Sequence, residues 1–233
     1  HRRRQRQMCI RDRSRHLKTG DSNQAQITYS QSAEMVWFVA LPSSFALCLV
    51  PLPLVSALFE HGETSRQDAL AISYATAIYG LGLPAFMIQK LLQPLYFARE
   101  DTKTPLRFAV ISMLLNAILA ITLLKVMGWI AVAVAASASA WVTSILLWIS
   151  AKKFGRAASA LKTSTNRIKR TFFASLVMGI ILWAASQNIY IAMQTSAERV
   201  FFAIGLVFAG STIYLVIVYM LQAFPKNSEK ALN

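Results

Sequence analysis

The stretch that decides the fold is Leu91-Leu-Gln-Pro-Leu-Tyr-Phe-Ala-Arg-Glu-Asp-Thr-Lys-Thr-Pro-Leu-Arg107. It is a charged segment that contains two prolines and lies between long apolar runs. Because each proline disfavours the helical conformation for the residue before it, the stretch is predicted to be a loop. Charged side chains are costly in hydrocarbon, about 3 kcal/mol or more each, so this loop indicates a membrane surface. The apolar runs on either side then indicate membrane-spanning helices.

The composition also indicates a polytopic membrane protein. Of the 233 residues, 55% are hydrophobic and only 15% are charged, and the mean hydropathy is +0.46. A soluble domain of this size would need more polar surface. A formal net charge of +14 can suggest nucleic-acid binding, but here the basic residues gather before the first apolar run and beside the later ones. Cytoplasmic membrane anchors have this distribution, so no nucleic-acid partner is expected.

Six apolar runs are long enough to cross hydrocarbon, so the predicted fold is an all-α transmembrane helix bundle with six spans. The predicted spans cover residues 35–59, 69–89, 108–124, 126–151, 171–197 and 200–224. The first contains Pro42, Pro51 and Pro53 and is predicted to kink. A short connection at 125–128 and a turn at Glu198-Arg199 are predicted to join the third and fourth and the fifth and sixth spans.

The charges of the connections predict the orientation. The loops at 90–107, 152–170 and 226–233 are basic, whereas the loop at 60–68 and the turn at 198–199 are not. Since cytoplasmic loops carry an excess of Lys and Arg, both ends of this chain are predicted to be cytoplasmic. The small residues of the second and fourth spans, at 80–84 and 131–140, predict close helix–helix packing.

No catalytic or metal-binding group of residues emerges from the sequence. His1, His16 and His61 stand apart from one another, and the carboxylates of Glu100 and Asp101 are adjacent. Adjacent residues on a helix point about 100° apart, so these two carboxylates do not form an acid–base pair. No glycine-rich phosphate-binding loop is found either. The sequence therefore predicts a protein that is not an enzyme, with no metal and no cofactor.

The loop carries a resemblance to a known family. Tyr96-Phe-Ala-Arg-Glu-Asp-Thr-Lys-Thr-Pro105 resembles the (F/Y)-Y-(A/S)-R-(Q/E)-D-T-(K/R)-T-P signature of the MurJ (MviN) lipid II flippases of the MOP exporter superfamily. Two flanking segments are similar to further family patterns, Tyr79-Gly-Leu-Gly-Leu-Pro-Ala-Phe86 and Leu58-Phe-Glu-His-Gly62. The similarity is good over residues 15–156 and weaker over the last two spans. It implies that the six spans are helices nine to fourteen of a fourteen-helix fold.

The resemblance also implies a domain organisation. Residues 35–151 would be four helices of a C-terminal lobe, and residues 171–225 a C-terminal helix pair that forms a lipid groove. A polar segment (15–34), a basic loop (152–170) and a tail (226–233) would be cytoplasmic. Residues 1–14 are predicted to be a non-native or disordered basic head. They resemble a translated sequencing adapter, and a lipid-surface tether is the alternative.

The implied function is transport in bacterial peptidoglycan and cell-wall assembly. Family members move lipid II, the undecaprenyl-diphosphate-linked muropeptide, from the cytoplasmic to the periplasmic leaflet of the inner membrane by alternating access. The expected partners are lipid II and membrane lipids, with Na⁺ or H⁺ as the candidate coupling ion. The family's N-terminal lobe, which holds most arginines of the central cavity, is expected to be missing here. The alternatives are another polysaccharide-lipid flippase or antiporter of the superfamily, and a membrane scaffold subunit without transport activity.

Candidate site residues come from the signature. The resemblance places Arg99 at the cytoplasmic mouth, where its guanidinium suits the anionic headgroup, and Lys103 and Lys90 are grouped with it. Simple positive-inside anchoring is the alternative for the basic residues. Asp101 and the hydroxyls of Thr102 and Thr104 are predicted to cap the helix that begins near Pro105.

Two further candidates lie outside the loop. Arg170 matches a family position beside the lipid-tail groove, with membrane anchoring as the alternative. Asn116 is the one strongly polar side chain inside the third span. Some family members have a sodium site there with a second oxygen ligand four residues on, but this chain has Ala120 at that position. A hydrogen bond between helices through Asn116 is therefore the favoured prediction, ahead of an ion site.

Overall fold

The computed structural model of the protein describes residues 22–61, 64–158, 161–189 and 195–225. Across these residues the regular structure is entirely helical, and six helices are long and apolar enough to cross a membrane. The prediction of an all-α bundle with six spans is confirmed. The predicted head at 1–14 and the tail at 226–233 lie outside the described residues.

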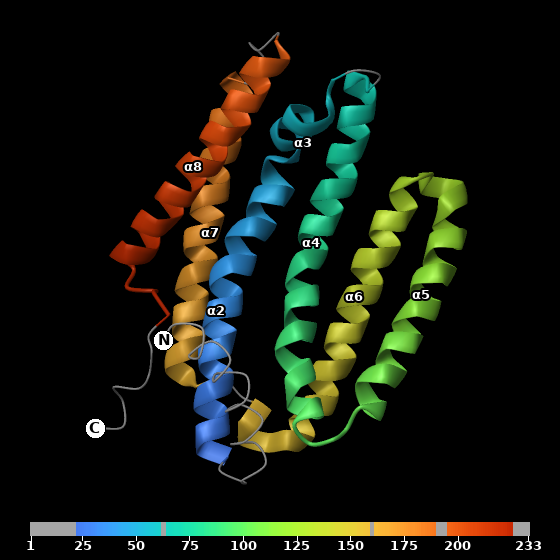
Figure 1. Ribbon diagram of the computed structural model, residues 1–233, viewed down its shortest axis with the longest axis vertical. Helices are drawn as coiled ribbons and strands as arrows, with labels where there is room; N and C mark the ends of the chain where they lie inside the picture. Colours follow the sequence, from blue (N-terminus) through green and yellow to red (C-terminus); the bar gives the residue numbers. More distant parts are fainter. Residues whose placement is uncertain (1–21, 62–63, 159–160, 190–194, 226–233) are drawn as a thin grey trace, which may run out of the picture.

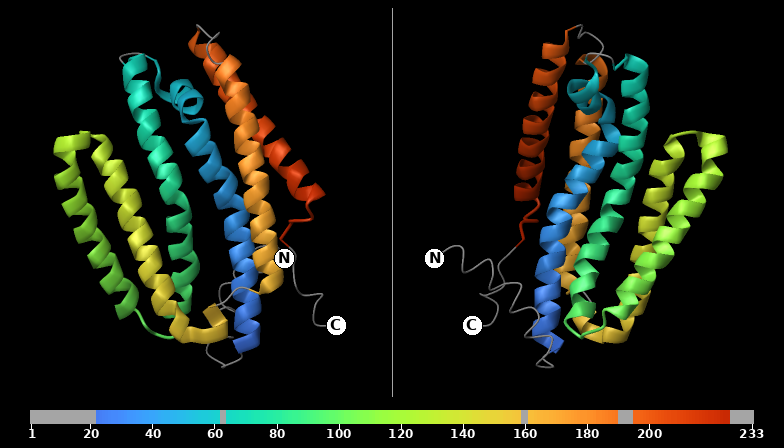
Figure 2. Two further views of the ribbon diagram at one scale, coloured as in Figure 1. Left: turned by 180° about the vertical axis from the view of Figure 1, so that it is seen from behind. Right: turned by 45° about the vertical axis from the view of Figure 1, so that its right-hand side comes forward.

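The helices stand side by side in a curved row (Figure 1). α2 lies between α4 and α7, α6 packs beyond α4, and α5 packs beyond α6. α8 packs against α7 and α3, as the views from two further directions show (Figure 2). The elements are α2 (Ser22–Leu49), α3 (Pro51–Phe59), α4 (Arg66–Phe97), α5 (Lys103–Met127), α6 (Ile130–Ala151), the 3₁₀ segment η1 (Lys152–Ala158), α7 (Lys162–Ile189) and α8 (Ser196–Met220).

The first predicted span is divided into two helices. α2 continues through Pro42. The helix is interrupted at Val50 (φ −128°, ψ 46°), directly before Pro51. Pro51 then begins α3, a position where its missing N–H costs nothing. The prolines therefore produce a helix break in place of the predicted kink. α2 begins at Ser22, so the helix extends well before the apolar run that starts at Met35.

The prediction that residues 91–107 form one loop is wrong for most of the stretch. α4 continues through Pro84 and Pro94 to Phe97, and α5 begins at Lys103, so residues 98–102 alone lie between the two helices. Proline is tolerated inside a membrane helix when surrounding groups compensate for the lost backbone bond. Around Pro94 the apolar side chains on the same helix are buried, namely those of Leu91, Leu92, Leu95 and Tyr96. Their packing stabilises the helix where local preference alone predicts a loop.

Two other predicted connections are displaced. Lys125 lies in the last turn of α5, and the connection to α6 is made by Gly128 (φ 58°) and Trp129, so the predicted connection at 125–128 is wrong. Glu198 and Arg199 lie in the first turn of α8 instead of forming the turn before it. The reason is a capping box, in which Thr195 and Glu198 satisfy each other's backbone N–H groups and so begin a helix. α7 likewise begins at Lys162, inside the predicted loop at 152–170.

The interface between α4 and α6 depends on small residues, as predicted. An added Cβ at Gly82 would lie 2.7 Å from Ser137 Oγ and 3.3 Å from its Cα, so only glycine allows this approach. Ser137 Oγ donates to the carbonyl of Ile78 (2.9 Å), and Ser144 Oγ donates to that of Ala85 (2.6 Å). Half of the residues in the most apolar window of α6 are buried, whereas no residue of the corresponding window of α5 is buried.

Ion pairs join the connections at each end of the bundle. At one end, the lower end in Figure 1, Lys153 of η1 pairs with Asp101 of the α4–α5 loop (3.0 Å). At the other end, Arg199 of α8 pairs with Glu60 directly after α3 (2.6 Å). The α4–α5 loop and η1, which lie within two of the predicted basic loops, thus share one end, and the segments with Glu60 and Arg199 share the opposite end. This arrangement agrees with the charge pattern from which the orientation was predicted.

Candidate functional site at the α4–α5 loop

The short segment after α4 is a tight turn built on the last turn of that helix. The N–H groups of Arg99 and Asp101 both donate to the carbonyl of Tyr96, and that of Glu100 donates to Phe97. Glu100 adopts a positive φ of 60°, the left-handed conformation that commonly ends a helix. The turn directs the side chain of Asp101 toward the start of α5.

Asp101 joins three parts of the structure. Its Oδ1 accepts from the N–H of Thr104 (3.1 Å), and its Oδ2 accepts from the Thr104 hydroxyl (2.9 Å) and from Lys153 Nζ (3.0 Å). The hydrogen bond from Lys153, followed by those from Thr104, holds the pKa of the Asp101 carboxyl below its usual value. The capping prediction is confirmed for Asp101, whereas the Thr102 side chain makes no capping hydrogen bond.

Aromatic side chains fix the loop to η1. Tyr96 is fully buried, and its hydroxyl donates to the carbonyl of Leu147 in α6 (2.7 Å). The ring of Phe154 in η1 meets the Tyr96 ring edge to face, with centroids 5.0 Å apart. Lys153 Nζ lies 5.5 Å from the centroid of Tyr96 and 5.0 Å from that of Phe154. The loop therefore rests on a platform of two aromatic rings.

Arg99 lies on that platform. Its guanidinium carbon is 4.2 Å from the centroid of Phe154, and one terminal nitrogen donates to the carbonyl of Leu95 (3.3 Å). The residue remains exposed at the surface, and partial burial lowers its pKa without removing the charge. The positive charge of Arg99 is thus held in a defined place and is open to a ligand.

The other basic candidates are exposed and less constrained. Lys90 lies on α4 and Lys103 is the first residue of α5, and both are exposed. Neither forms an ion pair with a described residue. The N–H and the hydroxyl of Thr104 both donate to Asp101, so Thr104 stabilises the loop. Arg99 and Lys103 are therefore the exposed basic candidates at the loop, and Asp101 and Thr104 form the hydrogen-bonded pair that supports it, whereas Lys90 lies farther back on α4.

Arg170 contacts the end of α8. One of its guanidinium nitrogens donates to the carbonyl of Leu221 (3.0 Å), directly after that helix ends. A cation suits this place because the C-terminal carbonyls of a helix carry partial negative charge. The arginine therefore joins α7 to α8 and is not among the residues that line the nearby cavity.

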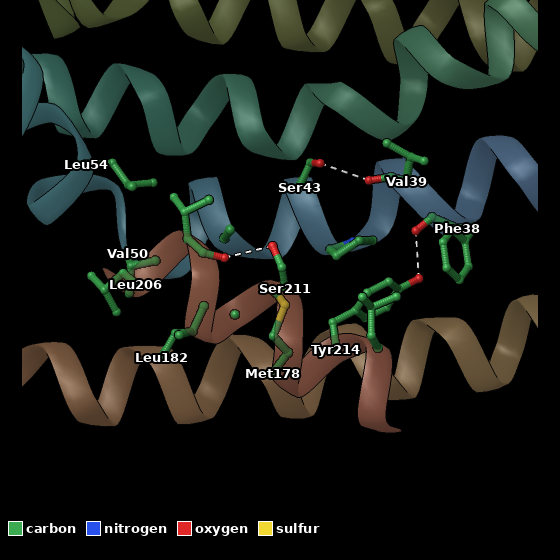
Figure 3. A pocket seen from close by; sticks show the side chains of 15 residues that line it. Phe38, Val39, Ser43, Val50, Leu54, Met178, Leu182, Leu206, Ser211 and Tyr214 are labelled. Carbon is green, nitrogen blue, oxygen red and sulfur yellow. Dashed lines mark hydrogen bonds between the residues drawn. The ribbon is translucent and has the colours of Figure 1, made fainter. Parts of the chain in front are cut away.

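An apolar cavity of about 400 Å³ lies between α2, α7 and α8 (Figure 3). Its walls include Phe38 of α2 and Val50, which directly follows α2. Met178 and Leu182 of α7 and Tyr214 of α8 line the other sides. The Tyr214 hydroxyl donates to the carbonyl of Phe38 (2.6 Å) and so fastens α8 across one end of the cavity. A space with such walls suits hydrocarbon chains.

Asn116 does not make the predicted hydrogen bond between helices through its Oδ1, which is buried without a partner among the described residues. Ser112, one turn earlier on α5, makes the contact to α6 by donating to the carbonyl of Ser139 (3.2 Å). Over the described part of the chain, no group of three His, Cys, Asp or Glu residues could hold a metal ion. The ion site at Asn116 stays a prediction.

Sequence reasoning missed several residues that the fold brings together. Phe154 and Lys153 were read only as part of a basic loop, and no local pattern points from them to Arg99. Glu34 of α2 is buried and pairs with Arg167 of α7 (3.1 Å). A carboxylate directly before a long apolar run was the one available signal, since a charge at such a place usually has a partner.

Comparison with known proteins identifies the family. The family model described as "Lipid II flippase MurJ" matches residues 12–208. A probable lipid II flippase MurJ of Rhizobium meliloti (strain 1021) is 34% identical over 209 residues, which cover 88% of this chain and 39% of the relative. One of Vibrio cholerae is 29% identical over 204 residues, with 88% of this chain and 39% of the relative covered.

The fold matches a solved member of the same family. The structure titled "Lipid II flippase MurJ, inward closed conformation" is similar with a TM-score of 0.72 and 23% identity, covering 92% of this chain and 42% of that one. The chain thus spans about two fifths of the length of the proteins it matches. The predicted resemblance is confirmed, and the chain belongs to the lipid II flippase MurJ family.

Proposed function

We propose that this chain forms the C-terminal part of a flippase that moves lipid II from the cytoplasmic to the periplasmic leaflet of the bacterial inner membrane by alternating access. The observation that carries the proposal is the family match over residues 12–208. The fold supports it, because six apolar helices follow one another in the order of a solved MurJ structure. The part of the relatives that this chain does not span would supply the rest of the transport path.

The exposed basic group at the α4–α5 loop is proposed to receive the anionic headgroup. Arg99 supplies a fork of N–H donors that fits the oxygens of a diphosphate, and Lys103 at the start of α5 acts as a point charge. Lys90 lies about two turns before the end of α4 and is a more distant point charge. Asp101 and Thr104 hold the loop in shape through their mutual hydrogen bonds. A surface built in this way attracts an anionic lipid headgroup and also defines where it first docks.

The apolar cavity between α2, α7 and α8 is proposed to hold part of the undecaprenyl tail. Its volume of about 400 Å³ is too small for the whole tail, so it would receive one segment of the chain. Arg170 supports this groove by fixing the end of α8 through Leu221. Its proposed role is therefore to shape the groove and not to contact the lipid tail.

The orientation is proposed from the charges. The end that carries Arg99, Lys103, Lys152 and Lys153 faces the cytoplasm, and both ends of this chain lie there as well. The domain boundaries predicted from the sequence are retained as proposals, with the lobe and the helix pair as separate units. The protein is proposed to transport without catalysis, driven by an ion gradient or the membrane potential, with Na⁺ or H⁺ as the coupling ion.

The test is complementation by a chimera. This chain replaces the matching region of the Rhizobium meliloti relative, and the chimera is expressed in cells depleted of their own flippase. Arg99→Ala should reduce growth strongly, whereas Lys152→Ala should have little effect, because the Lys152 ammonium lies over the ring of Trp148 (4.6 Å). Equal and full growth with both variants would reduce the loop to a membrane anchor.

A transport assay separates the alternatives. Lipid II and a polysaccharide-linked carrier lipid are compared as substrates in vesicles that contain the chimera. Preference for lipid II supports the proposal, and preference for the other carrier supports a different flippase of the superfamily. A scaffold subunit would transport neither lipid and would tolerate the loss of charge at Arg99, provided that it still inserts.

A further inference from the structure

We propose that Phe154 of η1 is a positioning residue for Arg99, and that its ring holds the guanidinium at the place where an anionic headgroup docks. The inference deepens the proposed function and rests on it. Phe154 would not touch the lipid. It would act through Arg99, by restricting the conformations of a long side chain at an exposed surface.

The contact has the geometry of a cation–π interaction. The guanidinium carbon of Arg99 lies 4.2 Å from the centroid of the ring, well inside the range of about 6 Å over which an aromatic face attracts a cation. Arginine forms such contacts well because its planar group can stack on the ring while its N–H groups stay free at the edge. In the described part of the chain, Arg99 uses one hydrogen bond, to the carbonyl of Leu95, which leaves further N–H donors for an anion.

The Phe154 ring is held by contacts that do not involve Arg99. Its neighbour Tyr96 is fully buried, anchored through its hydroxyl to Leu147, and meets the Phe154 ring edge to face. Lys153, next to Phe154 in the chain, is tied to Asp101 across the loop. η1 follows α6 directly, and Phe154 lies before the kink at Gly155 (φ 60°), so the contacts of its ring and not the helix itself hold it in place. Because the ring is held in place, its contact with the guanidinium restricts the conformations of the Arg99 side chain.

Two substitutions separate the aromatic face from simple packing. Phe154→Leu keeps an apolar side chain but removes the π system, and Phe154→Trp keeps an aromatic face that binds cations well. The first measurement is the rate at which phenylglyoxal, an arginine-specific reagent, modifies Arg99 in the purified chimera, followed by mass spectrometry. Arg107 on the exposed side of α5 is the internal control, because it has no contact with the ring.

The expected result is a rise in the Arg99 modification rate of about two- to fivefold in Phe154→Leu, the range that corresponds to an exposed cation–π contact. Phe154→Trp should keep the original rate, and the rate at Arg107 should not change in either variant. An unchanged rate at Arg99 in Phe154→Leu would overturn the proposal. An equal rise at Arg107 would also overturn it, because that result would indicate general loosening of the fold.

The second measurement is complementation with a double substitution. Phe154→Leu should reduce growth less than Arg99→Ala does. Phe154→Trp should grow like the original chimera. Phe154→Leu combined with Arg99→Ala should be no worse than Arg99→Ala alone, because the ring acts only through the arginine. Additive loss would overturn the positioning role. If Arg99→Ala complements fully while the modification rates behave as expected, the ring holds Arg99 but the proposed function of Arg99 fails.

Discussion

The two sides of α2 are held by different kinds of contact. On the side of α4, Ser44 Oγ donates to the carbonyl of Gly80 (2.7 Å), and an added Cβ at Gly80 would lie 2.9 Å from Cys48 Sγ. The same kind of contact continues between α4 and α6. On the side of α7, a buried ion pair forms between Glu34 and Arg167 (3.1 Å). Small residues and serine hydroxyls thus join the helices of the lobe. The contact between α2 and α7 also includes a close approach at Gly179, where an added Cβ would lie 2.6 Å from Leu49 Cδ1, but it differs by its buried ion pair.

The difference has an energetic meaning. Hydrogen bonds from serine to a backbone carbonyl are individually weak, about 1 kcal/mol each, so the lobe depends on many of them together with close packing. A buried ion pair behaves differently, because loss of one partner leaves the other charge buried and uncompensated. The lobe should therefore tolerate the loss of any one polar contact, whereas loss of one partner of the Glu34–Arg167 pair should weaken the packing of α7 against α2 clearly.

The largest effect is expected for Glu34→Ala. This substitution leaves Arg167, which is only 19% exposed, without its partner and should lower the free energy of unfolding by about 3 kcal/mol. The measurement is the loss of the monodisperse peak on size exclusion after heating of the detergent-solubilised chimera.

The control for this prediction removes both charges. Glu34→Met combined with Arg167→Met replaces the pair with apolar side chains and should recover most of the lost stability. If the double variant is as unstable as Glu34→Ala, an unpaired buried charge does not explain the loss of stability. The two sides of α2 would then not differ in the way proposed.

Overpacking should have the next largest effect. Gly82→Val places a branched side chain where even a Cβ would meet Ser137, and the helices α4 and α6 must separate, at a cost of about 2 kcal/mol. Gly205→Val on α8 is the matched control, since a Cβ there meets nothing within 4 Å. Thermal stability of the two variants should differ clearly. Similar stability of both would show that the approach at Gly82 is not essential to the lobe.

A single hydrogen bond is tested by Tyr96→Phe. The change removes the hydroxyl that donates to Leu147 and leaves a buried carbonyl without that donor, so the expected loss is about 1 kcal/mol. Tyr219→Phe on the exposed surface of α8 should not change stability. Because the bond at Tyr96 also supports the ring of Phe154, the modification rate of Arg99 should rise in Tyr96→Phe as well. Equal melting of both variants would contradict the prediction.

The same comparison explains what the sequence could predict. The small residues at 80–84 and 131–140 predicted close packing because their effect depends only on their size, and the charge-free runs predicted six spans for a similar reason. The loop predicted around Pro94 is wrong, because the burial of residues such as Tyr96 overcomes the local preference of proline for a loop. The pairing of Glu34 with Arg167 and of Arg99 with Phe154 could not be predicted, because nothing local specifies which distant residue becomes the partner.

The smallest effect tests whether burial, and not charge alone, makes the Glu34–Arg167 pair strong. Asp101 and Lys153 form a similar pair, but their side chains are 25% and 49% exposed, where solvent screens the attraction. Because the pKa of Asp101 is lowered in the folded state, its stabilising effect should be complete above the usual value of 3.8 and should be lost as the pH falls through the lower folded value. The difference in melting temperature between the original chimera and Asp101→Asn should therefore be constant at higher pH, smaller than that for Tyr96→Phe, and should vanish in acid. In a Lys153→Met background the loss should be complete closer to pH 3.8, since the largest cause of the shift is gone. A difference as large as that of Glu34→Ala would mean that charge acts regardless of burial in this protein.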